Sequence, residues 1–317
     1  MHLKNRNLYF YFMMQDTITP PLLKVGDQVA IIATGKQISS LEIEDAKTCF
    51  ESWGLKVRIG ASIGLTHHYL AGKDSDRLAD LQQAIDSSEI KAIFFARGGY
   101  GTMRILDAVN FEGLQKKPKW LVGFSDLTIL HTHIQNSFPL VTIHGIMPVF
   151  FPSATTASIQ SLKNLLFKGV MHYEIEVHNN WCTSGEVEGK ITGGNLAMLS
   201  SAVGSESALN CKEKILFIED LFEYHYKIDR MLQTLQRAGN LEGVKGLIVG
   251  SFTHMEQGNP AFESDLAAVI LPYFKPLNIP IVWDFPSGHI DDNRALFLGK
   301  ETKMKVENKK IILTSVK

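Results

Sequence analysis

A serine at the junction of an apolar strand and a helix is the first residue in this sequence that could act as a nucleophile. The residues from Gly123 to Asp126 read Gly-Phe-Ser-Asp and separate an apolar segment, 120–124, from an expected helix, 126–135. The first N–H groups of a helix have no intrahelical partner and can stabilise an oxyanion. The small Gly123 leaves room for a sharp turn, so Ser125 is a candidate nucleophile. The alternative is that Ser125 or Asp126 only caps the helix.

His289 is the candidate base. A serine hydroxyl is a weak nucleophile unless a base activates it. Of the eleven histidines, His289 follows an expected strand, 279–283, and a short loop that contains Pro286 and Gly288. Loops held at strand ends often carry functional residues. The alternative is an ordinary histidine in a surface loop.

Glu219 is the candidate partner for that base. It ends the apolar strand 214–218, where a carboxylate is costly without a partner. An imidazole N–H would be such a partner, and the pair would fix the tautomer of the histidine. A carboxylate that caps the helix beginning near Tyr224 is the alternative, and Asp220 and Glu223 compete for the same role.

A glycine-rich loop follows another expected strand, 90–96. Residues Arg97–Gly101 read Arg-Gly-Gly-Tyr-Gly, and such a loop lets backbone amides approach a ligand closely. The spacing of a dinucleotide fingerprint or a P-loop is absent, so a phosphate cradle is not favoured. We expect an oxyanion or substrate-carboxylate site with an N–H from Gly98 or Gly99. A plain turn is the alternative.

Three further signals are weaker. His131 and His133 fall in one expected helix, where residues i and i+2 point apart, so they do not predict a metal site. His144, at the end of an expected strand, could be a rival base or a supporting group. The segment Thr192–Leu196 reads as a helix start, and its Asn195 could face a cleft.

Alternating segments must position these residues. In the first half we expect strands at 29–33, 55–59, 90–96, 120–124 and 140–144, with helices at 40–53, 74–85, 103–109 and 126–135. This alternation predicts a mostly parallel sheet covered by helices on both faces. Ligands of such sheets bind beyond the carboxyl ends of the strands, where the candidate loops lie.

The second half predicts a smaller mixed α/β domain. We expect strands at 214–218, 246–251 and 279–283, helices at 225–238 and 262–274, and a hairpin of 296–298 with 304–313. The predicted domains are 15–167 and 186–317, joined by an irregular connection, 168–185. Residues 1–14 are expected to be a disordered extension, with Met13 or Met14 as the true start.

Composition excludes several classes of function. The chain has 317 residues, 45% of them hydrophobic, and a formal net charge of -1, so it lacks the basic excess typical of binding to nucleic acid or anionic membranes. No apolar run is long enough to span a bilayer, and we expect a soluble, cytoplasmic protein. The three cysteines are odd in number and widely spaced, so they predict neither a disulfide framework nor a metal site.

Taken in order, seven segments resemble the LD-carboxypeptidase family of serine peptidases. Each segment is unspecific alone, but seven in one order across nearly the whole chain are specific. They are Arg97–Gly101, Gly123–Asp126, His144–Gly145, Thr192–Leu196, Phe217–Asp220, Tyr226–Arg230 and Phe285–His289.

The resemblance implies a fold and a mechanism. Members have a flavodoxin-like N-terminal α/β domain, a C-terminal domain around a small β-barrel-like sheet, an active site between the two and, typically, a homodimer. The matching positions make Ser125 the nucleophile, His289 the general base and acid, and Glu219 its orienting carboxylate. The Gly98–Gly99 loop and the amide of Asp126 would form the oxyanion hole. No metal or organic cofactor is implied.

The resemblance also implies a substrate. The typical reaction releases the terminal D-alanine from a murein tetrapeptide during cell-wall recycling, while a related branch cleaves adenylate conjugates and confers immunity to microcin C. The free carboxylate of D-alanine needs a cationic or N–H-rich pocket. Candidate substrate-binding residues are Arg97, Tyr100, Asn195 and Arg294. The alternatives outside the hydrolases are a non-catalytic protein that binds a phosphate or nucleotide, and a scaffolding protein.

Overall fold

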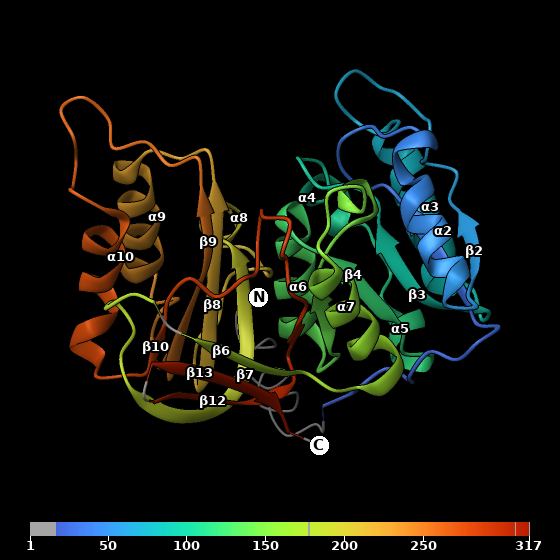
Figure 1. Cartoon of the computed structure of the whole chain (residues 1–317). Coiled ribbons are helices and arrows are strands. Elements are labelled where there is room, and N and C mark those ends of the chain that lie inside the picture. The colour runs from blue at the N-terminus through green and yellow to red at the C-terminus, as the bar shows by residue number, and fades with distance from the viewer. Residues whose placement is uncertain (1–16, 177, 308, 317) are drawn as a thin grey trace, which may run out of the picture.

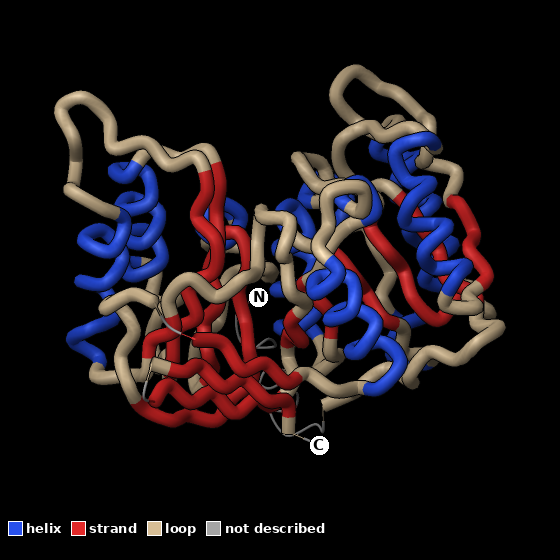
Figure 2. Tube along the Cα trace, viewed as in Figure 1, coloured by secondary structure: helices blue, strands red, loops and turns tan. Residues whose placement is uncertain are grey.

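The computed structural model describes residues 17–176, 178–307 and 309–316 of the chain. These residues form two lobes, each built around one sheet that carries helices (Figure 1, Figure 2). The extension expected at residues 1–14 lies outside the described residues. The predicted α/β class, with a mostly parallel first sheet and a mixed second sheet, is confirmed.

The first sheet has the strand order β11-β5-β4-β3-β1-β2, with all neighbours parallel except β11 and β5. Its strands are β1 (Gln28–Ile32), β2 (Lys56–Ile59), β3 (Ile90–Phe95), β4 (Trp120–Gly123), β5 (Thr142–His144) and β11 (Leu296–Leu298). Its helices are α2 (Glu44–Ser52), α3 (Asp74–Asp86), α4 (Met103–Leu106), α5 (Glu112–Lys116), α6 (Thr128–Ser137) and α7 (Thr156–Lys168). Short 3₁₀ turns are η1 (Leu41–Ile43), η2 (Ser125–Leu127) and η3 (Pro148–Phe150).

The inner strands of this sheet are apolar on both faces because helices cover both faces, whereas the edge strand β2 is partly exposed. In β1, Val29 and Ile31 enter one hydrophobic cluster, whereas Ala30 and Ile32 enter another. Alternate residues of a strand point to opposite faces, so one short apolar run supplies two cores. This explains why the inner strands of the first half appear in the sequence as continuous apolar runs.

The second sheet has the strand order β10-β9-β8-β7-β12-β13-β6, parallel from β10 to β7 and antiparallel from β7 to β6. Its strands are β6 (His172–Glu176), β7 (Gly185–Asn195), β8 (Lys214–Leu221), β9 (Gly246–Thr253), β10 (Ile281–Val282), β12 (Glu301–Glu307) and β13 (Lys310–Ser315). The helices are α8 (Leu196–Ser201), α9 (His225–Arg237) and α10 (Leu266–Phe274), followed by the 3₁₀ turn η4 (Lys275–Leu277).

Two expectations were wrong: the pairing of 296–298 and the irregular structure of the whole stretch 168–185. Residues 296–298 do not pair with 304–313: they form β11, which joins β5 of the first sheet, and the hairpin is β12 with β13. All three side chains of β11 are buried although it is an edge strand of the first sheet, while β12 alternates buried and exposed residues as a half-exposed hairpin strand does. The stretch 168–185 is not irregular throughout, because β6 pairs with β13 inside it.

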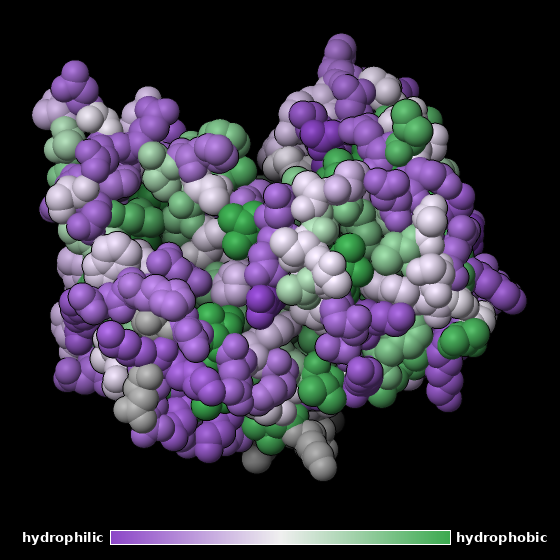
Figure 3. All heavy atoms as spheres, in the orientation of Figure 1, coloured by the Kyte–Doolittle hydropathy of each residue, from purple (hydrophilic) through white to green (hydrophobic). Residues whose placement is uncertain are grey.

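The two lobes share structure instead of being joined by one linker. Strand β11 comes from the second half of the chain but extends the first sheet, and one hydrophobic cluster includes residues of both sheets, such as Ile143 and Phe217. The backbone N–H of Asn195, at the end of β7, donates to the Thr128 hydroxyl at the start of α6 over 3.0 Å. A cleft remains between the upper ends of the lobes (Figure 3). The domain boundaries given above stay a prediction.

Candidate active site

Ser125 stands at a sharp turn between β4 and η2. Its φ is +62°, a left-handed conformation that is strained for a residue with a Cβ, and its side chain is partly exposed. Such strain persists only where surrounding structure imposes it, and it clusters at active sites. A Cβ on Gly123 would lie 3.0 Å from Leu127 Cγ, so the tight turn depends on that glycine. The hydroxyl of Ser125 makes no hydrogen bond within the described residues.

His131 holds this turn in place through hydrogen bonds, a role that the sequence did not predict. Its Nε2 lies 2.9 Å from the carbonyl oxygen of Gly123 and its Nδ1 lies 2.9 Å from the Thr142 hydroxyl. A carbonyl can only accept, so Nε2–H donates to Gly123 and Nδ1 accepts from Thr142. Burial lowers the pKa of His131 to about 4, which keeps the ring neutral in this arrangement. The histidine is a structural tie for the turn.

Glu219 and His289 form a buried pair in the second lobe. Glu219 lies in β8 and is fully buried, whereas His289 follows β10 and is 10% exposed. The Nδ1–H of His289 donates to Glu219 Oε2 over 2.6 Å. Because Nδ1 carries the proton in this hydrogen bond, Nε2 of the neutral ring is free to accept one.

The pair shifts the titration of the imidazole. Burial alone would lower the pKa of His289, but the charge and hydrogen bond of Glu219, with the charge of Asp220, outweigh it. The pKa of His289 therefore lies above its ordinary value of 6.5. Neutral His289 is the form that can act as a base, and it is populated above that pKa.

The loop that contains His289 is held close to Glu219 by tight packing and a hydrogen bond at Gly288. Gly288 has a φ of +123°, and a Cβ there would lie 2.9 Å from Glu219 Cβ and clash with the Ser251 hydroxyl. The N–H of Gly288 donates to Asn293 Oδ1 over 2.9 Å, and Asn293 is itself buried. Only glycine fits this approach, so the Pro and Gly signal in the sequence has a physical cause.

The two lobes bring the candidate base next to the candidate nucleophile. The ring of His289 packs against the ring of Phe124, with centroids 4.8 Å apart. Phe124 directly precedes Ser125, so the imidazole of the second lobe lies beside the turn that carries Ser125 in the first. No hydrogen bond joins the Ser125 hydroxyl to His289 among the described residues. In unliganded enzymes such bonds are often long and tighten when substrate binds.

The glycine-rich loop lies against the same serine. A Cβ on Gly98 would be 3.3 Å from Ser125 Oγ and 3.4 Å from the Asp126 nitrogen. The Gly98 carbonyl accepts from Lys36 N over 3.1 Å, and in a trans peptide the following N–H, that of Gly99, points the opposite way. Within the described part of the chain, the N–H groups of Gly99 and Asp126 donate to no other residue. Both are available to an oxyanion.

The predicted competitors have other partners. Asp220 accepts from Asn195 Nδ2 and from the N–H of Ala197, each over 2.9 Å, and so anchors the start of α8. Burial, together with the charge of Glu219, raises the pKa of Asp220 to about 7. Glu223 pairs with Lys227 at 3.1 Å.

His144 is fully buried, so it cannot reach a substrate. Burial and the neighbouring His131 and His289 hold the pKa of His144 well below its ordinary value. A neutral ring packed between Phe124 and Phe217 supports the floor of the site. Of the two readings that the sequence left open for His144, burial favours the supporting group.

The candidate substrate-binding residues differ in what they can still contact. Arg97 pairs with Glu42 at 3.2 Å and lines a pocket of about 310 Å³ next to the glycine-rich loop. Tyr100 is 47% exposed. Arg294 pairs with Asp292 at 3.1 Å. Both polar atoms of the buried Asn195 side chain are occupied, by Asp220 and by the N–H of Met198, so its contacts favour a role as a helix cap.

Comparison with known proteins decides the family. The model of the LD-carboxypeptidase N-terminal domain matches residues 29–145, and that of the LD-carboxypeptidase C-terminal domain matches residues 188–304. The chain belongs to the LD-carboxypeptidase family. A relative from Bacillus subtilis (strain 168), named probable murein peptide carboxypeptidase, is 33% identical over 298 residues, which cover 93% of each chain.

Solved structures of this family and its relatives share the fold. The crystal structure of muramoyltetrapeptide carboxypeptidase from Oxalobacter formigenes has a TM-score of 0.82 and 26% identity, and the match covers 92% of this chain and 99% of that one. The microcin C7 self immunity protein MccF in its wild-type apo state has a TM-score of 0.83 and 22% identity, with coverage of 94% and 98%. The second likeness concerns the fold alone.

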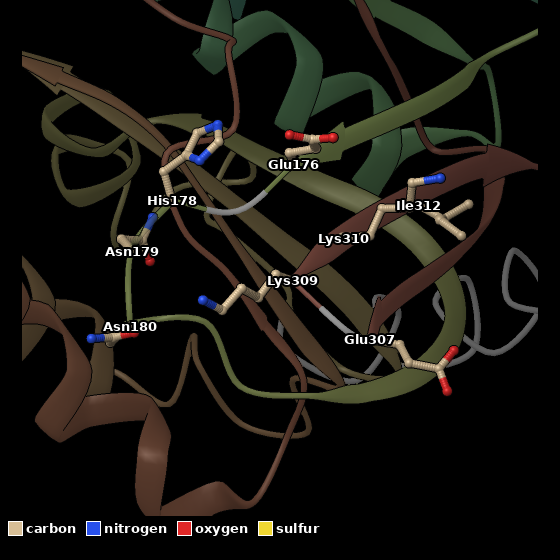
Figure 4. A pocket seen from close by; sticks show the side chains of 8 residues that line it. All are labelled: Glu176, His178, Asn179, Asn180, Glu307, Lys309, Lys310 and Ile312. Atoms are coloured by element: carbon tan, nitrogen blue, oxygen red, sulfur yellow. The ribbon is translucent and has the colours of Figure 1, made fainter.

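Other polar features of this LD-carboxypeptidase lie away from the serine. No group of three His, Cys, Asp or Glu side chains that could hold a metal occurs among the described residues. A pocket of about 490 Å³ lies around β6 and β13, and in Figure 4 the Lys309 side chain extends toward the loop with Asn179 and Asn180. None of the candidate site residues lines it. No described helix is long and apolar enough to cross a bilayer.

Proposed function

We propose that this protein is a serine carboxypeptidase that releases the terminal D-alanine from murein tetrapeptides, with Ser125, His289 and Glu219 as its catalytic triad. The bond cut joins an L-configured centre to D-alanine. The names of the relative from Bacillus subtilis and of the solved carboxypeptidase from Oxalobacter formigenes support this substrate class.

One observation carries the proposal: the hydrogen bond from His289 to buried Glu219 leaves Nε2 free beside the nucleophile turn. In the proposed mechanism, Ser125 Oγ attacks the carbonyl carbon while Nε2 of His289 takes its proton. The imidazolium is stabilised by Glu219 and then protonates the leaving amine of D-alanine. Water, activated by the same histidine, hydrolyses the acyl-enzyme and regenerates the serine.

The oxyanion of both tetrahedral intermediates needs preorganised donors. We assign this role to the N–H groups of Gly99 and Asp126, with Gly98 as the close neighbour that leaves room for the oxyanion. Each such donor lowers the barrier by about 3 kcal/mol, which corresponds to roughly 100-fold in rate. No step of this mechanism calls for a metal or an organic cofactor.

The carboxylate of D-alanine requires a cation or N–H groups. Arg97 and Arg294 are the proposed ligands, and exposed Tyr100 is a third group within the same loop as Arg97. Each arginine already pairs with one carboxylate of the protein, and a guanidinium has five donors, so a second carboxylate can still bind. Loss of either arginine should raise KM more than it lowers kcat.

The test is mass spectrometry after incubation of the purified protein with a murein tetrapeptide. The proposal predicts loss of one alanine, and a tetrapeptide that ends in L-alanine should stay intact. Ser125→Ala serves as the inactive control. An unchanged L,D-tetrapeptide would contradict the proposal: cleavage of an aminoacyl sulfamoyl adenosine would then favour the microcin-type activity, and cleavage of neither would favour a non-catalytic ligand-binding protein.

We also propose that the enzyme works in the cytoplasm, as a homodimer. Both suggestions depend on resemblance to the family, whose members recycle cell-wall peptides inside the cell. Light scattering coupled to size-exclusion chromatography tests the dimer, and a mass equal to one chain of 35.4 kDa would contradict it. Fractionation of cells with an antibody to the protein tests the location, and recovery outside the cytoplasmic fraction would contradict it.

A further inference from the structure

Two loops at the carboxyl ends of β1 and β3 are packed into each other beside Ser125. A Cβ on Gly35 would lie 2.8 Å from the Gly98 carbonyl oxygen, and Lys36 N donates to that same oxygen over 3.1 Å. Glycine-rich segments have more backbone freedom than others, and ordering them costs conformational entropy. Something must hold this loop in place if its N–H groups are to meet an oxyanion at fixed distance.

Arg77 of α3 is the first tie. It is 0% exposed, and its Nη1 donates to the Gly101 carbonyl over 2.8 Å and also to the Thr34 carbonyl. One nitrogen therefore joins the loop after β1 to the loop after β3. The other end of the guanidinium meets Asp74, which is partly exposed. Burying a guanidinium costs several kcal/mol unless its donors are used, and here Nη1 is used on the two loops and Nη2 on Asp74.

Asp126 is the second tie, on the side of the nucleophile. Its carboxylate is 1% exposed, and Oδ2 accepts from the N–H of Thr102 over 3.0 Å. The hydroxyl of Thr102 lies 2.7 Å from that of Thr34, and both threonines are fully buried. Asp126 directly follows Ser125, so the backbone that carries the nucleophile is bonded to the end of the glycine-rich loop.

We propose that Arg77 and the carboxylate of Asp126 are positioning residues that hold the Gly98–Gly99 loop at the distance from Ser125 at which its N–H groups stabilise the oxyanion. This inference rests on the proposed function. Neither side chain touches the reacting atoms, because both are buried behind the loop. They act through the backbone: donors must stand about 2.7–3.1 Å from the developing oxyanion, and a loop free to move by 1 Å would lose much of that stabilisation.

The experiment compares Arg77→Met and Asp126→Ala with two matched controls. Arg104→Met removes a partly exposed arginine whose side chain pairs with the same Asp74 but bonds to neither the Thr34 nor the Gly101 carbonyl. Asp126→Asn keeps an oxygen that can accept from the N–H of Thr102. The backbone N–H of residue 126 is present in every variant, so the oxyanion donor itself is unchanged.

Two assays are run on each folded variant. The first gives kcat and KM on the murein tetrapeptide. The second gives the rate of phosphonylation by a fluorophosphonate, which needs the same oxyanion site but not the peptide. We expect about a 100-fold loss of kcat and of the phosphonylation rate in Arg77→Met and Asp126→Ala, with KM within about 3-fold of wild type. On the same argument, both kcat and the phosphonylation rate of Asp126→Asn should stay within about 10-fold of wild type. Those of Arg104→Met should stay within about 2-fold.

A wild-type rate of phosphonylation in either natively folded variant overturns the proposal, and so does an Asp126→Asn variant as slow as Asp126→Ala. If Arg77→Met does not fold, Asp126→Ala decides. A wild-type protein that reacts with the phosphonate but leaves the tetrapeptide intact refutes the proposed substrate and leaves the phosphonylation rates as the test of positioning. A wild-type protein that does not react at all refutes the serine mechanism itself.

Discussion

Replacing Glu219 by glutamine removes one charge from the buried pair and keeps its shape. The carboxylate is fully buried and accepts from His289 Nδ1 over 2.6 Å, so little solvent screens the interaction. The charge centres of such a pair lie on the order of 4 Å apart, and at an effective dielectric constant of about 20 their attraction is about 4 kcal/mol. The imidazolium forms in the transition state, whereas the active form of the resting enzyme has a neutral His289, so this energy is lost from catalysis.

We therefore expect Glu219→Gln to lower kcat on the tetrapeptide by about 1,000-fold, with KM within about 3-fold of wild type. The pH profile should change as well. In the wild type, kcat/KM should rise with pH through an apparent pKa above 6.5, because His289 must be neutral to act as a base. Without the charge of Glu219, burial dominates, and the acid limb should move to lower pH.

The matched control is Glu223→Gln, the same substitution four residues later at a carboxylate that pairs with Lys227 and not with His289. It should leave kcat and the acid limb unchanged. Thermal unfolding of all three proteins checks that the fold is kept. The reasoning is refuted if folded Glu219→Gln retains kcat within 10-fold of wild type, or if its acid limb coincides with that of the wild type.

Three other substitutions test the geometry around the serine. Gly98→Ala places a methyl group 3.3 Å from Ser125 Oγ without a left-handed φ, so kcat should fall by about 100-fold while the melting temperature changes little; an active Gly98→Ala would argue against the oxyanion site. Ser125→Gly should be more stable than Ser125→Ala by about 1 kcal/mol in denaturant unfolding, because glycine relieves the strain at φ +62°, and both should be inactive; equal stability would mean that the turn is not strained. Gly288→Ala should lose both stability and activity because its Cβ meets Glu219, whereas Gly204→Ala, also at positive φ but in open space, should lose only stability; equal activity of the two variants would contradict the role of the loop.

The parts of the fold that depend on local sequence were predictable. Short apolar runs predicted the inner strands β1, β3, β4 and β5 of the first sheet, and residue types at the strand ends predicted the candidate serine, histidine and glutamate. A buried carboxylate and a loop histidine each need a partner for physical reasons, so the pair could be anticipated although 70 residues separate its members.

The features that the sequence did not predict depend on contacts between residues far apart in the chain. The run Leu296–Leu298 is apolar and buried throughout, a pattern that does not say which sheet it joins, and its partner β5 lies about 150 residues earlier. In the expected helix 74–85, Leu81 and Ile85 are buried and Leu78 packs against the same cluster, as an apolar helix face should. The buried face also includes Arg77, which was not expected, because its partners are carbonyls of loops that sequence alone cannot place beside the helix.

In the proposed mechanism, the hydroxyl of Ser125 is the nucleophile and His289 activates it. The most direct measurement is peptide mapping by mass spectrometry after reaction of the whole protein with a fluorophosphonate, carried out on the wild type and on His289→Ala. We expect one adduct on Ser125 in the wild type, formed far more slowly in His289→Ala. An adduct on another residue, or equal rates in the two proteins, would contradict it.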